Sequence, residues 1–232
     1  MTDVHDGTRS DATDQDPGQG ADRDVLRAWV DGWVLSRGAS APVEEPWGFR
    51  IEVGRPNHVR RYVLPTADPA VLRELASTID TPGAWLKVCA PADAVAPLLT
   101  DGWSIPTDEY LMATALRPTE AAPPAGYSVR STTTGGITEV QVLAADGETA
   151  ATGRIASTGS TAVFDQISTD PAHQRRGLGR LMMASLGNSA AARGATMAVL
   201  GASREGRELY LALGWTLHSP LTPAVFRPPS AA

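Results

Sequence analysis

The chain's most distinctive run of polar residues and glycines lies at positions 170–180, in the sequence Asp-Pro-Ala-His-Gln-Arg-Arg-Gly-Leu-Gly-Arg. This stretch follows the β-type run 161–168 and leads into a helical pattern of apolar residues that starts at Leu178. Gly177 and Gly179 lack the Cβ atoms that would keep backbone N–H groups away from a ligand. Because a helix N-terminus carries unpaired donors and the positive end of the helix dipole, the stretch predicts a binding site for an anion such as a phosphate.

Two common phosphate-binding motifs do not fit this stretch. A P-loop requires Gly-Lys-Ser/Thr after its glycines, whereas Arg180 and Leu181 follow Gly179. The dinucleotide fingerprint requires a small residue at the position of Met182 and an acidic residue about twenty positions further on, where the chain has the apolar run 197–200. The glycine turn alone fits an ordinary strand-to-helix connection equally well, so the flanking sequence has to decide.

The pattern Gln174-x-x-Gly177-x-Gly179 resembles the loop that binds the pyrophosphate of coenzyme A in the GNAT superfamily of acyl-CoA-dependent N-acyltransferases. The resemblance extends over about residues 127–218 and includes a second family motif, Tyr210-x-x-x-Gly214-Trp215, on a later helix. It implies that acetyl-CoA is the co-substrate and that the strand before the loop holds its pantetheine arm. The residues to which the resemblance assigns cofactor contacts are Ile167, Ser168, Thr169, Gln174, Arg175, Arg176, Gly177, Leu178, Gly179, Arg180 and Ser203.

The same resemblance implies catalytic roles. Acyl transfer from a thioester to an amine requires a neutral amine, donors that face the developing oxyanion, and a proton for the departing thiolate. The family supplies the proton from the tyrosine that corresponds to Tyr210, and a donor from a backbone N–H, here near Ile167 or Thr169. Where some members have a glutamate base this chain has Val163, so the base role falls to Asp165 on the same strand face. A packing role for the tyrosine, a structural role for the aspartate and a water chain as the base remain alternatives.

Composition and charge argue against several classes of protein. The formal net charge is −6, and residues 1–24 contain seven Asp and two Arg, so the remainder of the chain is nearly neutral. A nearly neutral body argues against a nucleic-acid-binding protein. We interpret Arg60 and Arg61 as part of a solvated strand or loop.

Cysteine, histidine and apolar runs exclude further classes. The single cysteine, Cys89, rules out an intramolecular disulfide, and the four His have no spacing suited to a zinc site. Cys89 lies in the run 85–89, which is typical of a buried strand, so we interpret it as a packing residue. No apolar run approaches the roughly 18 residues of a membrane span, and the N-terminus lacks the apolar core of a signal peptide. We therefore expect a cytoplasmic protein with no metal and no membrane or nucleic-acid partner.

The N-terminal part predicts a polar tail followed by a first set of helices and strands. Residues 1–21 contain almost no large apolar residue and are expected to be disordered. An apolar stripe at helical spacing predicts an amphipathic helix over 24–37, with Asp22 or Asp24 as its cap and Gly38 as its stop. The further elements expected are strands at 49–53, 59–64 and 85–89 and helices at 68–79 and 91–100.

The C-terminal part predicts antiparallel hairpins, a helix, a strand and a short helix. A linker at 117–126 precedes strands at 127–130, 137–143, 149–156 and 161–169, and a further strand is expected at 196–200. Only six residues separate Arg130 from Ile137, whereas the resemblance implies two helices there that shape the acceptor site. We expect the helix over 24–37 to take their place.

The two parts of the chain share a spacing that predicts an internal repeat. Trp85 and Met197 each open an expected strand, and each is followed 17 residues later by a glycine and then a tryptophan. At this offset the loop glycines and the motif tyrosine correspond to Pro65, Ala67 and Leu98. Proline has no N–H for a phosphate and leucine has no proton to donate, so we expect the first copy to be a scaffold.

These observations together predict an α/β protein of two GNAT-like units in tandem, each a mixed, mostly antiparallel sheet flanked by helices. The expected order is an acidic tail (1–21), a degenerate GNAT-like domain (22–116), the linker, and an acetyl-CoA-binding GNAT domain (127–232). The expected function is direct transfer of an acetyl group from acetyl-CoA to a primary amine of a small-molecule or peptide acceptor. The alternative is a non-catalytic acyl-CoA-binding or protein-interaction module, and a homodimer is compatible with the missing acceptor-side helices.

Overall fold

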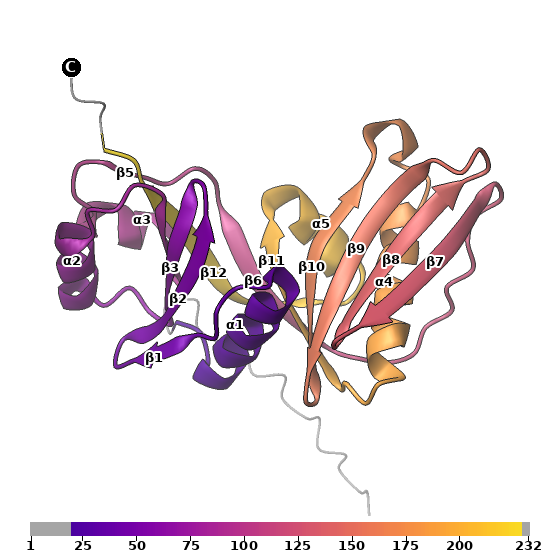
Figure 1. Cartoon of the computed structure of the whole chain (residues 1–232), viewed down its shortest axis with the longest axis horizontal. Coiled ribbons are helices and arrows are strands. Elements are labelled where there is room, and N and C mark those ends of the chain that lie inside the picture. The colour runs from indigo at the N-terminus through magenta and orange to yellow at the C-terminus, as the bar shows by residue number, and fades with distance from the viewer. Residues whose placement is uncertain (1–19, 229–232) are drawn as a thin grey trace, which may run out of the picture.

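A computed structural model describes residues 20–228 of this chain (Figure 1). The expected disordered tail, apart from Gly20 and Ala21, lies outside the described residues. The described part contains one twelve-stranded sheet, and the fold is α/β as expected.

The strands and helices are as follows. In sheet order the strands are β1 (Val43–Glu45), β2 (Gly48–Arg55), β3 (His58–Leu64), β4 (Ala84–Val88), β12 (Thr216–Phe226), β6 (Glu109–Ala115), β11 (Met197–Ser203), β10 (Thr161–Thr169), β9 (Thr149–Thr158), β8 (Ile137–Ala144) and β7 (Tyr127–Thr134), and the short β5 (Trp103–Ser104) pairs with β12. The helices are α1 (Arg23–Arg37), α2 (Pro69–Thr78), α3 (Ala92–Val95), α4 (Leu178–Ala191) and α5 (Arg204–Ala212).

Three apolar clusters assign the helices to the two faces of the sheet. Successive residues of a strand point to opposite faces. On β3, Val63 packs in a cluster with α1, whereas Leu64 packs with Leu72 of α2. On β10, Val163 belongs to the α1 cluster and Phe164 to the cluster around α4 and α5. α1 therefore covers the centre of one face, and α2 to α5 cover the other.

α1 confirms the amphipathic helix expected at 24–37. The Asp22 carboxylate caps its first turn by accepting hydrogen bonds from the N–H groups of Asp24 and Val25. Gly38 ends the helix with a left-handed φ of 61°.

Close approach of α1 to the sheet depends on a glycine. A Cβ atom at Gly32 would lie 2.3 Å from Cγ2 of Val163 on β10, so only glycine lets the helix backbone come this near. α1 packs on β9, β10 and β11.

Two strands cross between the halves of the chain. β6, which precedes the linker, lies between β11 and β12, and β12, from the end of the chain, lies between β4 and β6. Figure 1 shows β6 and β12 side by side at the centre of the sheet. Each half thus completes the sheet of the other. The sequence-based analysis assigned no strand to 109–115 or to 216–226.

The order of elements is the same in both halves. β3, α2, the parallel β4 and α3 are matched by β10, α4, the parallel β11 and α5. Gly102 and Gly214, which share the expected offset, both have left-handed φ angles, 88° and 83°. The expected helix at 91–100 is α3 followed by a 3-10 turn at Ala96–Leu98.

Candidate active site

The expected site lies where two parallel strands stop pairing. β10 and β11 are in register from Thr161 with Met197 to Phe164 with Leu200, and the ladder ends there. Beyond that point β10 has a bulge between Asp165 and Ser168 in its pairing with β9, and Gln166 adopts a left-handed φ of 55°. Ile167 lies in this bulge, so its backbone groups belong to neither regular ladder. The strand segment that is expected to hold the pantetheine arm is therefore irregular. Its backbone N–H and C=O groups are not all used in strand pairing, and an active site at this position needs such groups.

The N-terminus of α4 provides unpaired donors beside this segment. Gly177 is the N-cap, with φ of 79°, and no side chain caps the helix. Among the described residues no acceptor binds the N–H groups of Leu178, Gly179 and Arg180, and the first bond of the helix is from the Leu181 N–H to the Gly177 carbonyl at 3.1 Å. The helix end is thus a free anion-binding position of the kind predicted.

The two loop glycines have different roles. A Cβ at Gly177 would meet nothing within 4 Å, and its left-handed φ is what favours glycine there. A Cβ at Gly179 would lie 2.9 Å from Cδ2 of Leu209, so this glycine permits close packing of α4 against α5.

The polar residues of the loop make few bonds to the protein. Arg175 is exposed and has a left-handed φ of 62°. Arg176 donates to the Tyr127 hydroxyl at 3.0 Å, and that hydroxyl also lies 3.0 Å from Nδ1 of His173. The Gln174 amide is 3.5 Å from the Thr169 carbonyl oxygen.

Ser203 occupies the start of the next helix. Its hydroxyl is the N-cap of α5 and accepts from the Gly206 N–H at 3.1 Å. The side chain is therefore engaged in capping, which differs from the cofactor contact that the resemblance assigned to this position.

Tyr210 lies on α5 among apolar side chains. It is 8% exposed, and its ring centroid lies 5.9 Å from that of Trp215. Burial raises the pKa of Tyr210 to about 12, so the phenol keeps its proton at neutral pH. The hydroxyl has no hydrogen-bond partner among the described residues, and its oxygen is not completely enclosed by other protein atoms. It therefore remains reachable by a small group.

Asp165 is held by α1. Its carboxylate accepts two hydrogen bonds from Arg37, at 2.6 and 2.7 Å, and one from the Ser36 hydroxyl at 2.6 Å. Although burial opposes the charge, these bonds hold the pKa of Asp165 below its ordinary value. The geometry does not support the expected role as general base, because a carboxylate paired in this way has little affinity for a proton.

At the corresponding end of the N-terminal half the helix donors are already bonded within the protein. Asp68 caps α2 by accepting from the N–H groups of Ala70 and Val71, so the donors of that helix are already used. The Pro65 carbonyl, at the end of β3, accepts from the Ala21 N–H at 2.8 Å. These contacts leave no free helix donor for a phosphate at this position.

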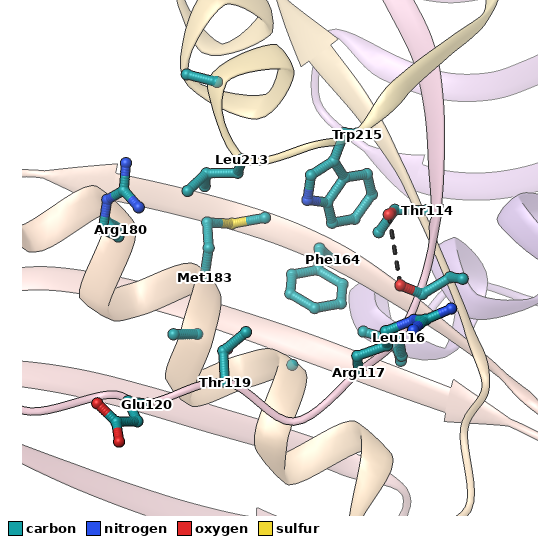
Figure 2. A pocket seen from close by; sticks show the side chains of 14 residues that line it. Thr114, Leu116, Arg117, Thr119, Glu120, Phe164, Arg180, Met183, Leu213 and Trp215 are labelled. Carbon is teal, nitrogen blue, oxygen red and sulfur yellow. Dashed lines mark hydrogen bonds between the residues drawn. The ribbon is translucent and has the colours of Figure 1, made fainter.

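Figure 2 shows a pocket of about 390 Å³ on the face that carries α4 and α5. Phe164, Met183 and Trp215 provide apolar surface, and Arg180 and Glu120 lie at its edge. Of the residues assigned to the site, only Arg180 lines this pocket, so the pocket is not the expected anion site.

A charged cluster under α1 was missed by the sequence-based analysis. Arg61 of β3, Lys87 of β4 and Glu109 of β6 face α1, and Lys87 donates to the Glu109 carboxylate at 2.5 Å. The interpretation of Arg61 as solvated is wrong, since only 7% of this residue is exposed. Strand periodicity could have identified it, because Arg61 lies two residues before the buried Val63.

The remaining expectations concern Cys89, metals and membranes. Cys89 is buried and free, and burial raises the pKa of its thiol to about 12, as expected for a packing residue. Within residues 20–228 no group of His, Cys, Asp and Glu is arranged to hold a metal ion. None of the helices in this part of the chain is long and apolar enough to cross a membrane.

Comparison with known proteins identifies the region around this site. The family model of the acetyltransferase (GNAT) domain matches residues 137–217. Residues 137–217 are therefore similar to a GNAT acetyltransferase domain. This stretch contains the β10 bulge, the α4 N-terminus and Tyr210.

Solved structures extend the likeness in fold to most of the chain. A GCN5-related N-acetyltransferase from Kribbella flavida is 19% identical, with a TM-score of 0.61 over 90% of this chain and 96% of that one. A protein from Novosphingobium aromaticivorans DSM 12444 assigned to the GNAT family is 14% identical, with a TM-score of 0.56 over 91% and 99%. A tandem GNAT protein from the clavulanic acid biosynthesis pathway is 15% identical, with a TM-score of 0.50 over 68% of each chain. A search of curated proteins finds no match.

Proposed function

We propose that this protein is an N-acetyltransferase that moves the acetyl group of acetyl-CoA directly to a primary amine. The observation that carries the proposal is the uncapped N-terminus of α4, with Gly177 at φ 79°, next to the point where β10 and β11 stop pairing. The GNAT domain match over 137–217 supports acyl transfer in general. A cytoplasmic location is part of the same proposal.

Residues of the chain fit the phosphate and pantetheine parts of the co-substrate. The free N–H groups of Leu178, Gly179 and Arg180 suit a diphosphate, which accepts several donors at once. The exposed Arg175 adds a positive charge to this loop. The backbone at Ile167, outside the regular ladders, is available to an extended amide-containing arm and to the oxyanion of the transfer step.

The transfer requires balanced proton movements. The amine nitrogen forms a bond to the thioester carbonyl carbon, the carbon–sulfur bond breaks, and the sulfur leaves as a thiolate. Tyr210 is suited to donate a proton to that thiolate, because it is protonated at neutral pH and its hydroxyl has no partner among the described residues. The proton of the attacking amine leaves through water, since Asp165 is paired with Arg37.

Calorimetry with acetyl-CoA tests this proposal. We expect binding by the wild type and at least about 10-fold weaker binding by Gly177→Val, because a β-branched residue disfavours the left-handed φ and shifts the cradle. Gly147→Val is the matched control: Gly147 has φ of 88°, lies in the β8–β9 turn, and a Cβ there also meets nothing within 4 Å. No binding by the wild type, or equal effects of both substitutions, would refute the proposal.

A second candidate is a non-catalytic acyl-CoA-binding or protein-interaction module on the same scaffold. The observation that favours it is the lack of a free carboxylate base on β10, where Val163 packs under Gly32 and Asp165 is bound to Arg37. Thiol release distinguishes the two functions. If Tyr210→Phe binds acetyl-CoA but loses thiol release, the enzyme is supported; if the wild type releases no thiol with any amine of a broad panel, the module is.

A further inference from the structure

Arg61 stands out among the charged residues under α1. Its guanidinium carbon lies 3.7 Å from the ring centroid of Trp33 and 5.9 Å from that of Trp29, both on α1. Its Nε donates to Nε2 of His58 at 3.3 Å. Burial and the neighbouring cations lower the pKa of His58 to about 3, so this imidazole is neutral and adds no counter-charge.

The other charges of the cluster are already paired. Lys87 is bound to Glu109, and Arg37 is bound to Asp165. Among the described residues no carboxylate lies within ion-pair distance of Arg61. The cluster therefore holds one cation more than it holds carboxylates.

The unpaired guanidinium belongs to a residue that is 7% exposed, so it is buried without being fully enclosed. Nη1 and Nη2 of Arg61 have no hydrogen-bond partner in residues 20–228. Neither nitrogen is completely enclosed by other protein atoms. Burial lowers the pKa of Arg61 to about 9, so the group remains charged at neutral pH. An isolated buried charge is costly unless a counter-ion joins it, and a guanidinium binds a carboxylate through two parallel hydrogen bonds.

The same helix connects Arg61 to the candidate active site. A Cβ at Gly201 would lie 3.5 Å from the indole ring of Trp29, and the Arg61 guanidinium carbon lies 5.9 Å from the centroid of that ring. Gly201 is the first residue of β11 beyond its ladder with β10, and it is exposed. Arg61 and the end of the ladder therefore both lie near Trp29, on the face that α1 covers.

We propose that Arg61 binds a carboxylate of the acceptor, so that the acceptor is an amine with a carboxylate at its far end, such as an ω-amino acid. This inference rests on the proposed acetyl transfer and names the acceptor class for it. With its carboxylate on Arg61, the acceptor extends past Trp29 and presents its amine where β10 and β11 separate.

Turnover of matched acceptors tests the inference. Thiol release from acetyl-CoA is measured with ω-amino acids and with their carboxamides, which keep the amine and remove the charge. The wild type is expected to prefer the acids by about 10- to 100-fold in kcat/KM, and Arg61→Met to lose that preference. Arg60→Met is the matched control, because Arg60 is the neighbouring residue on the opposite face of β3 and pairs with Glu52. It should keep the preference.

A binding measurement that needs no turnover accompanies this assay. Propionate is titrated while the tryptophan fluorescence is followed, since Trp33 stacks on Arg61. We expect a saturable change in the wild type, none with propionamide, and none in Arg61→Met. Arg61→Lys should bind propionate more weakly than the wild type, because it keeps the charge but not the paired donors.

The outcomes separate this inference from the proposed function. If acetyl-CoA does not bind, the transferase proposal fails, whereas the propionate titration still tests Arg61. If propionate causes no change in the wild type, or if acids and amides are turned over equally, the carboxylate site is refuted. An unchanged preference in Arg61→Met refutes it as well. If Arg61 had a structural role, the melting temperature of Arg61→Met would be more than about 4 °C below that of the wild type. If Arg61 is a ligand-binding charge without a partner in the free protein, no such decrease in melting temperature is expected.

Discussion

Removal of Arg37 tests how α1 is held against β10. In the wild type, Arg37 makes two hydrogen bonds to Asp165, whose side chain is 10% exposed, while 30% of the Arg37 side chain is exposed. Arg37→Met keeps much of the aliphatic side chain but removes both bonds. Asp165 then retains only the Ser36 hydroxyl as a side-chain donor.

The magnitude follows from the burial of the pair. Breaking a fully buried ion pair from one side costs about 3–5 kcal/mol, and the partial exposure of Arg37 places this case at about 2–3 kcal/mol. Arg37→Met, Asp165→Asn and the double variant form a cycle, and the coupling energy between the two residues should also be about 2 kcal/mol.

The effect should depend on pH. Because the pKa of Asp165 is lowered in the folded wild type, the pair contributes stability above the unfolded pKa, and this stability is lost as the pH falls through the folded value. Without Arg37, burial dominates and raises the pKa, so ionisation of Asp165 then costs stability as the pH rises. The difference between wild type and Arg37→Met should therefore be largest at about pH 7 and shrink towards about pH 4.

Urea unfolding followed by tryptophan fluorescence measures these free energies. Arg27→Met is the control, because Arg27 also lies on α1 but is 45% exposed and forms surface pairs with Asp31 and Glu44. It should cost less than about 1 kcal/mol. A coupling energy below about 0.5 kcal/mol, or a difference that does not change with pH, would refute this account of Asp165.

Two further predictions concern packing. Gly32→Ala should destabilise the protein by about 1–3 kcal/mol in urea unfolding, because the new Cβ would lie 2.3 Å from Cγ2 of Val163. This loss should outweigh the preference of alanine for helices. An unchanged or higher stability would show that α1 does not pack this closely. Cys89 should not react with a thiol reagent such as DTNB in the native protein, since its thiol is buried with a raised pKa of about 12, and should react on unfolding. Rapid labelling of the native state would contradict its burial.

Local patterns predicted the elements that carry their own signals. The helix over 24–37 has an apolar stripe, a capping aspartate and a terminal glycine, and each appears in α1. The loop before α4 was predicted from its glycines, and Gly177 caps that helix with a left-handed φ of 79°. Patterns of this kind involve residues that are close in the sequence, so they can be recognised without knowledge of the fold.

The strands that cross between the halves could not be predicted in this way. β12 contains Pro220 and Pro223, which disfavour a strand because proline cannot donate to a ladder. Its partners in β4 and β6 are distant in the sequence, and pairing between distant strands leaves no local pattern. The domain boundaries drawn from the sequence, 22–116 and 127–232, do not anticipate that each half contributes a strand to the other.

The same reason explains what was missed at the site. Lys87, Glu109 and Arg61 come from three strands, and only the exchange of β6 and β12 brings them together. Asp165 was chosen as the base from its position on β10, but its pairing with Arg37 depends on where α1 lies. Residue types and spacing predicted the cofactor loop, whereas the charges around the acceptor side follow from tertiary structure.

The exchange of strands also affects how the chain folds during its synthesis. The inner edge of β4 is covered only by β12, and Thr222 bonds to Ala90 across 132 residues of sequence. A nascent chain therefore cannot finish the sheet of its first half until β12 has left the ribosome, and until then β4 has an unpaired edge. The expected consequences are slow folding and a need for chaperones to protect the unpaired strand edge.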